Sequence, residues 1–101
     1  MATGIVRDGL FLEHIIDSFH PECPERLESI YAMLDTLKHD GLVFPSRRFA
    51  THDEIALNHA SAYIEWIAGT KGKGHTRLDP DTAASDRSYE AASAAVGGVL
   101  Q

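Results

Sequence analysis

The chain has 101 residues, of which 44% are hydrophobic and 24% are charged, and nine basic against fifteen acidic side chains give a net charge of -6. This composition excludes a wholly disordered protein, and the length suits one small domain over residues 1–101. The acidic balance disfavours nucleic acid and membrane surfaces as partners, and no apolar run approaches the roughly 20 residues of a membrane span.

The N-terminal part predicts a short strand, a loop and a helix. Residues 4–7 are expected to form a buried strand, and residues 13–23 predict a connecting loop. Pro24 is pre-set for a first helical turn, and Glu25 suits the positive end of the helix dipole. We therefore predict a helix from Pro24 to about Asp40, whose inner face carries Leu27, Ile30, Tyr31, Leu34 and Leu37.

The middle of the chain predicts a second helix. Residues 42–44 form a brief apolar run that is ended by Pro45, which indicates either a short strand or a packed connector. Thr51 and Glu54 have the spacing of a capping box, so a helix should begin there and end at Gly69. Its inner face would carry Ala56, Ala60, Tyr63, Ile64 and Ile67.

The C-terminal part predicts a loop and a third helix. Residues 70–87 are polar, with hardly any apolar side chain apart from Leu78, and this predicts a long exposed loop. Ser88 is a candidate cap for a helix through Tyr89, Ala92, Ala95 and Val96. Two glycines, Gly97 and Gly98, are expected to weaken that helix.

Six histidines raise the question of a metal site, but their spacing supports none. His20 and Cys23 form half of a possible zinc site, and no second pair with ligand spacing follows. His52 and His59 are seven residues apart and lack the i, i+4 spacing that lets two imidazoles meet one metal. Cys23 is also the only cysteine, which excludes an internal disulfide and favours a cytoplasmic location.

One string at the start of the first predicted helix is specific. The order His20-Pro21-Glu22-Cys23-Pro24-Glu25-Arg26-Leu27 resembles a signature of the histone deacetylase superfamily. That His-Pro-Glu-x-Pro-Glu-Arg-Leu signature lies near the start of bacterial and class II histone deacetylase-like proteins, including acetylpolyamine amidohydrolases and acetoin-utilisation proteins. Other features in the family's order are Thr3 to Val6 with Leu12 to His14, Asn58 to Ile64, and Asp81 to Ala92.

The resemblance covers nearly the whole chain, as the N-terminal portion of such a domain. It implies an α/β fold, namely a truncated N-terminal part of the arginase/deacetylase fold with about three helices and one or two short parallel strands. A mainly α fold is the alternative. The resemblance also implies that Arg26 lines an internal channel and that Asp81 grips the substrate backbone at the rim of the pocket.

In the full-length family, the chemistry uses a zinc ion held by an Asp-x-His pair and a second aspartate, with a His-His pair and a tyrosine. This sequence has no His-His and no Asp-x-His, and its three tyrosines lie on predicted packing helices. We therefore expect no catalytic residue, no metal site, no cofactor and no enzyme activity in the isolated chain.

Two functions remain open. The first is a non-catalytic deacetylase-like module that self-associates, as a dimer or another homo-oligomer, or that binds another protein chain. Its motivation is the strand edge and the helix faces that the rest of the fold would cover, because such surfaces recruit partners. The alternative is one part of a split zinc-dependent deacetylase or amidohydrolase, completed by another chain that brings the zinc ligands.

Overall fold

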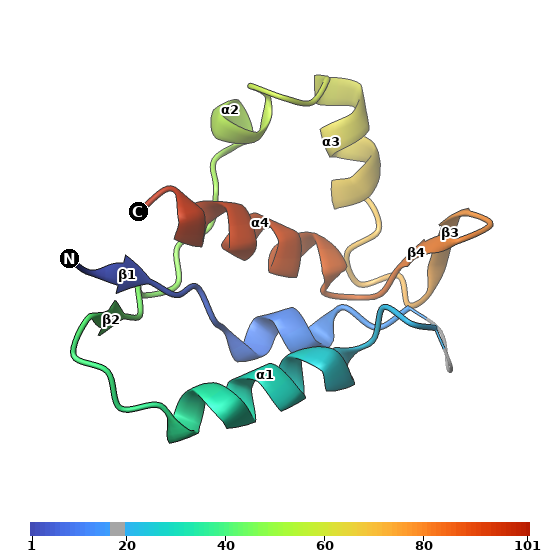
Figure 1. Cartoon of the computed structure of the whole chain (residues 1–101). Coiled ribbons are helices and arrows are strands. Elements are labelled where there is room, and N and C mark those ends of the chain that lie inside the picture. The colour runs from blue at the N-terminus through green and yellow to red at the C-terminus, as the bar shows by residue number, and fades with distance from the viewer. Residues whose placement is uncertain (17–19) are drawn as a thin grey trace.

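The structure is a computed structural model that describes residues 1–16 and 20–101, and over these residues it has four α-helices, one 3-10 helix and four short strands (Figure 1). In chain order they are β1 (Thr3–Gly4), η1 (Gly9–Glu13), α1 (Pro24–Thr36), β2 (Leu42–Val43), α2 (His52–Ile55), α3 (Ser61–Ala68), β3 (Thr76–Asp79), β4 (Thr82–Ala84) and α4 (Ser88–Val99). The predicted α/β class is confirmed, and the mainly α alternative is wrong.

The strands β1 and β2 form a short parallel pair, as the resemblance implied. Thr3 lies opposite Leu42, and Gly4 lies opposite Val43. The first strand is therefore shorter than the predicted residues 4–7, while the run before Pro45 is a strand rather than a packed connector. Proline ends the pairing because it has no N–H to donate to the ladder.

Helix α1 begins at Pro24 as predicted but ends at Thr36, four residues before the predicted end at Asp40. The Thr36 hydroxyl donates to the carbonyl of Met33 at 2.7 Å, and Leu37 already has an extended backbone. A threonine that bonds the preceding turn in this way weakens the continuation of a helix. The early end lets the chain turn back toward β1.

The inner face predicted for α1 is only partly covered. Tyr31 is half-buried and exchanges hydrogen bonds with the backbone of Asp8, just before η1. Ile30 and Leu37 remain 45% and 49% exposed, because among the described residues the main contact of α1 is with η1 alone. The helix packs on one neighbour and leaves part of its apolar face open.

The second predicted helix is in fact two helices. Its capping box forms, with Thr51 Oγ1 accepting from the Glu54 amide and Glu54 Oε1 accepting from the Thr51 amide. The chain then tightens into i to i−3 bonds at Leu57 and Asn58, and Ala60 becomes extended, which separates α2 from α3. Of the predicted inner face Ile64 is buried and Ile67 is half-buried, whereas Ala56, Ala60 and Tyr63 are exposed.

The predicted loop over residues 70–87 contains an antiparallel hairpin, which the sequence did not predict. Strand β3 pairs with β4 from Thr76 opposite Ala84 to Asp79 opposite Thr82, with an irregularity between Arg77 and Asp79. The strands were missed because their buried side chains are small: Ala83 and Ala84 are 1% and 2% exposed. Alanine is a weak signal for a strand.

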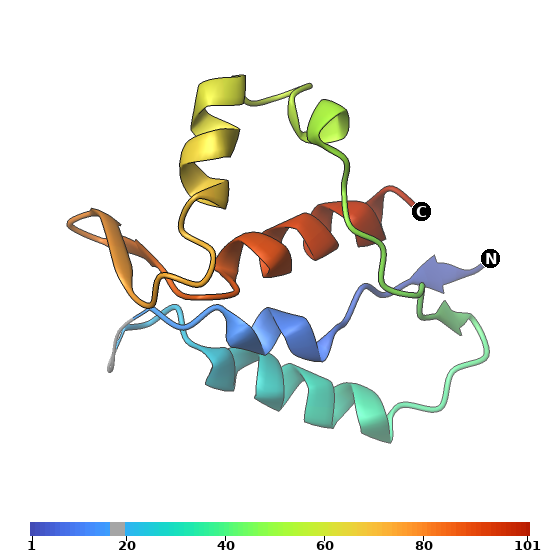
Figure 2. The same ribbon diagram turned by 180° about the vertical axis from the view of Figure 1, so that it is seen from behind.

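Helix α4 lies between the α2–α3 segment and the pair formed by η1 and α1 (Figures 1 and 2). Its N-cap is Arg87, and Ser88, predicted as the cap, is the first helical residue. The buried face consists of small residues, namely Ser88, Ala91, Ser93, Ala94, Gly97 and Gly98. Leu10 of η1 packs on Ala91 and Ala94. The predicted Ala92 and Val96 are exposed instead.

The two glycines of α4 do not interrupt the helix, and the expectation that they weaken it stays a prediction. A Cβ atom on Gly97 would lie 1.8 Å from the carbonyl oxygen of Arg48, and one on Gly98 would lie 2.5 Å from Cγ1 of Val6. The Ala50 amide donates to the Ser93 carbonyl at 3.0 Å alongside. Gly97 therefore lets the backbone at Arg48 and Phe49 lie directly on α4, and Gly98 makes room for the Val6 side chain.

The molecule is flat and open. It measures 42 × 34 × 19 Å, and its radius of gyration of 15.0 Å exceeds the roughly 13 Å of a compact domain of this length. Its accessible surface is 6822 Å², against about 5,700 Å² for a folded monomer of its mass. Within residues 1–16 and 20–101, no helix has the length and apolar character to cross a bilayer.

Candidate functional site

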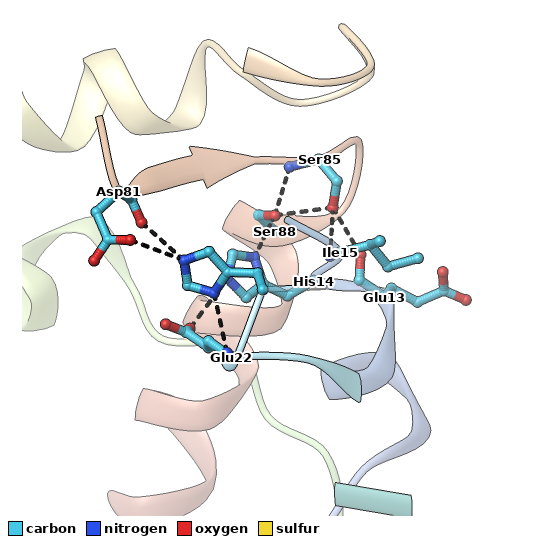
Figure 3. Close-up of polar contacts among 8 residues, drawn as sticks. Glu13, His14, Ile15, Glu22, Asp81, Ser85 and Ser88 are labelled. Carbon is cyan, nitrogen blue, oxygen red and sulfur yellow. Dashed lines mark hydrogen bonds and ion pairs between the residues drawn. The ribbon is translucent and has the colours of Figure 1, made fainter. Parts of the chain in front are cut away.

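Two residues singled out in the sequence, His20 and Asp81, lie in contact although they are 61 positions apart. The Nε2 atom of His20 lies 3.1 Å from Oδ1 of Asp81 and 3.2 Å from the Asp81 carbonyl oxygen. The amide of Glu22 donates to Nδ1 of His20 at 3.0 Å. Dashed lines mark these contacts in Figure 3. We call the His20–Asp81 pair the clasp.

The contacts of the ring fix which nitrogen of His20 carries the proton. A backbone N–H can only donate, so Nδ1 must accept and the proton of the neutral ring lies on Nε2. That N–H donates to the carbonyl oxygen and to Oδ1 of Asp81. A neutral imidazole therefore orients the carboxylate and leaves its negative charge in place.

Asp81 is restrained although its side chain is 92% exposed. Its amide donates to Oδ1 of Asp79 at 2.8 Å. This hydrogen bond is the main cause that lowers the pKa of Asp79, and a hydrogen bond from the Thr82 hydroxyl lowers it further. The ionised Asp79 thus holds the turn between β3 and β4, and this turn presents Asp81 at one end of the molecule.

A second set of bonds fastens the chain just before the signature to the start of α4 (Figure 3). Nδ1 of His14 lies 2.6 Å from the Ser88 hydroxyl, and its Nε2 lies 3.4 Å from Oε1 of Glu22. The Ser85 hydroxyl accepts from the Ile15 amide and donates to the Glu13 carbonyl. Sequence reasoning missed the contacts of His14, Ile15 and Glu13 with Ser85 and Ser88, since they join residues 70 or more positions apart. The sequence had singled out only Ser88, as a candidate helix cap.

The remaining signature residues lie in the first turns of α1 or just before it. Pro24 is in its first turn, Leu27 is half-buried, and Pro21 and Glu25 are exposed. Arg26, predicted to line a channel, also has an exposed side chain. The structure brings His20, Glu22 and Asp81 together, while the channel role of Arg26 stays a prediction.

The described residues do not fit a zinc centre. In residues 1–16 and 20–101, no group of three or more His, Cys, Asp or Glu side chains could hold a metal ion. His14, His20, Glu22 and Asp81 are engaged in the pairwise contacts above. We therefore derive no zinc-dependent step for this chain.

An apolar groove lies between the α2–α3 segment and α4, with a volume of about 270 Å³. Its lining includes Ile55, His59, Tyr63, Ile64, Tyr89 and Val96. The rings of His59 and Tyr63 are 5.4 Å apart, and Tyr63 meets Trp66 edge to face. Trp66, which contacts the lining residue Tyr63, is 52% exposed, and Leu57, next in sequence to the lining residue Asn58, is 83% exposed. This α3–α4 groove and its edge form an open apolar surface.

Comparison with known proteins places these features in a family. The model of the histone deacetylase domain matches residues 20–101. A crystal structure of the HDA15 HD domain is similar with a TM-score of 0.85 and 27% identity, over 96% of this chain and 29% of that chain. The present chain therefore spans less than a third of that relative. No curated protein sequence matches it.

Proposed function

Because the chain belongs to the histone deacetylase domain family, we propose that it is a non-catalytic, partner-binding part of a deacetylase-like domain. In this role it contributes the rim of the substrate pocket, and the zinc chemistry comes from residues outside these 101. The clasp carries the proposal, because it joins the family signature to the acid that the resemblance assigns to the rim.

The openness of the molecule supports the need for a partner. Its accessible surface exceeds that of a folded monomer of its mass by roughly 1,100 Å². A protein partner in a standard interface covers about 800 Å² on each side. Large apolar side chains such as Leu57 and Trp66 lie on this open surface, so covering them is favourable.

The partner favoured here is the zinc-bearing remainder of a deacetylase-like domain, in the same longer protein or in another chain. The chain has the backbone arrangement of the matching part of HDA15, which there belongs to a much longer chain. The second candidate is another copy of the chain, which the α3–α4 groove favours as an apolar surface. Two copies would, however, bring together net charges of -6 each.

The rim role would fall on Asp81. Its exposed carboxylate accepts N–H donors, and an extended peptide offers backbone N–H groups next to an acylated side chain. We expect this contact to position an acylated substrate and not to perform the hydrolysis. The net charge of -6 supports a protein, and not a nucleic acid, as the binding partner.

Light scattering and an activity assay test the proposal. The chain alone should not hydrolyse an acetyl-lysine peptide with zinc present, and it should do so after mixing with a segment that carries the His-His and Asp-x-His motifs. Zinc-dependent turnover by the chain alone would refute the non-catalytic role. A stable dimer at micromolar concentration that does not bind the zinc-bearing segment would favour the second candidate, another copy of the chain, as the partner.

A matched pair of variants locates the binding surface. Tyr63→Lys changes a half-exposed side chain that lines the α3–α4 groove, and Leu37→Lys changes a similarly exposed side chain at the C-cap of α1. Helix α1 lies on the other side of α4 from α3 (Figure 1). If the groove binds the partner, only the first variant should weaken association. If both variants weakened association equally, the groove would not be the binding surface.

A further inference from the structure

We propose that His20 is a positioning residue for Asp81: its Nε2–H sets the direction of the rim carboxylate, and the Glu22 amide sets the ring tautomer that makes this possible. The inference deepens the proposed function and rests on it, since the rim role of Asp81 belongs to that proposal. The family resemblance gives His20 only as part of a signature, and the role follows from the geometry of the clasp.

Asp81 is held at three atoms although its side chain is 92% exposed. Its amide is held by Asp79, and its carbonyl oxygen and Oδ1 are both held by His20. The His20 side chain is itself only 15% exposed, so the donor is fixed by its surroundings. Among residues 1–16 and 20–101, the bonds to the Asp81 side chain involve Oδ1, and the proposal assigns Oδ2 as the acceptor of a ligand N–H.

A purely stabilising role explains the clasp poorly. Polar contacts to a carboxylate at an exposed surface contribute little to stability, because water competes for the same groups and the side chain loses rotamer freedom. Fixing the direction of an acceptor does have a use in binding, because a ligand then meets a carboxylate that is already oriented. The clasp is therefore better understood as preorganisation of Asp81.

The tautomer gives a test that needs no partner and no activity. Long-range nitrogen NMR correlations of the His20 ring should find the proton on Nε2 at neutral pH. They should also find Nδ1 with the shift of an acceptor. A proton on Nδ1 would overturn the inference, because the Glu22 amide could then not bond to the ring and Nε2 could not donate to Asp81.

Two substitutions of His20 test the roles of Nε2 and Nδ1 separately. The side chain of His20→Gln carries an N–H near the position of Nε2, while that of His20→Asn places an acceptor near Nδ1 without a donor that reaches Asp81. We expect the Asn variant to shift the amide signals of residues 79–82 and the Gln variant to restore them. The signals of α4 should stay unchanged in both. Unchanged signals of residues 79–82 in the Asn variant would refute the positioning role.

The reconstituted assay supplies the functional readout. His20→Asn should raise KM for an acetylated peptide about tenfold with little change in kcat, the effect of one lost charge-assisted hydrogen bond. His20→Gln should bring KM most of the way back to the native value. In a chain that already carries Asp81→Asn, the further change His20→Asn should raise KM little. If the mixed chains never hydrolyse the peptide, the proposed function fails. The NMR results would still decide whether His20 positions Asp81.

Discussion

Replacing Gly97 by alanine tests whether α4 depends on close backbone contact. The new Cβ atom would lie 1.8 Å from the Arg48 carbonyl oxygen and 2.9 Å from the carbonyl carbon of Phe49. These are backbone atoms, which no side-chain rotation can move away. The backbone at Arg48 and Phe49 would have to move away from the helix, and the hydrogen bond from the Ala50 amide to the Ser93 carbonyl would be lost with it.

The expected magnitude follows from three opposing effects on the free energy of unfolding. Overpacking costs about 1–3 kcal/mol, and the lost hydrogen bond costs about 1 kcal/mol. Alanine returns about 1 kcal/mol because it favours the helix more than glycine does. The net loss is roughly 2 kcal/mol, which lowers the Tm of a domain of this length by about 10 °C.

Thermal unfolding followed by circular dichroism at 222 nm measures this loss. Gly9→Ala is the matched control, because a Cβ atom there meets nothing within 4 Å and the Tm should hardly change. Gly98→Ala should lie between the two, since its nearest obstacle is the Val6 side chain and not backbone. A Tm of Gly97→Ala equal to or above that of the native chain would refute the packing argument.

Three further predictions concern the polar contacts of the fold. Asp8→Ala should cost about 1 kcal/mol in urea unfolding, because Asp8 caps η1 through the Leu10 amide and pairs with Arg47; an unchanged midpoint would contradict the cap. Thr51→Ala should cost about 1 kcal/mol as the capping box of α2 is lost, while Thr51→Ser should keep most of it. The hydrogen bond of the Asp81 amide lowers the pKa of Asp79, so its stabilising effect is present above the ordinary aspartate pKa of about 3.9 and is lost as pH falls through the lower folded-state value. NMR shifts of the Asp81 amide should therefore stay constant from neutral pH to about 4 and change below it, whereas Asp79→Asn should abolish that titration.

The parts of the fold that the sequence predicted well are those governed by local chemistry. Pro24 began α1, and Thr51 and Glu54 formed their capping box, because both signals act within one helical turn. The errors arose where distant segments decide. Gly97 looked like a weak point of a helix, and only the Arg48 backbone lying against it reveals why a side chain is excluded.

The candidate site divides in the same way. The resemblance singled out His20 and Asp81 separately, and nothing in their spacing indicated that they meet. Their contact requires the β3–β4 hairpin, whose buried residues Ala83 and Ala84 gave too weak a pattern to predict. The second fastening, from His14 to Ser88, depends on how the start of α4 packs and was likewise beyond sequence reasoning.

The composition of the core supports the proposal that this chain binds a partner. Among the described residues, the buried hydrophobic side chains are Leu10, Ile16 and Ile64 together with four alanines. Burial of a large apolar side chain contributes about 1.5–3 kcal/mol, and alanine contributes much less, so this core supplies little of the driving force needed to fold a chain of 101 residues. Larger side chains such as Trp66 and Leu57 lie outside it. Under the proposed function, a second protein surface on the α3–α4 groove and the residues around it would bury these side chains and add the missing hydrophobic stabilisation.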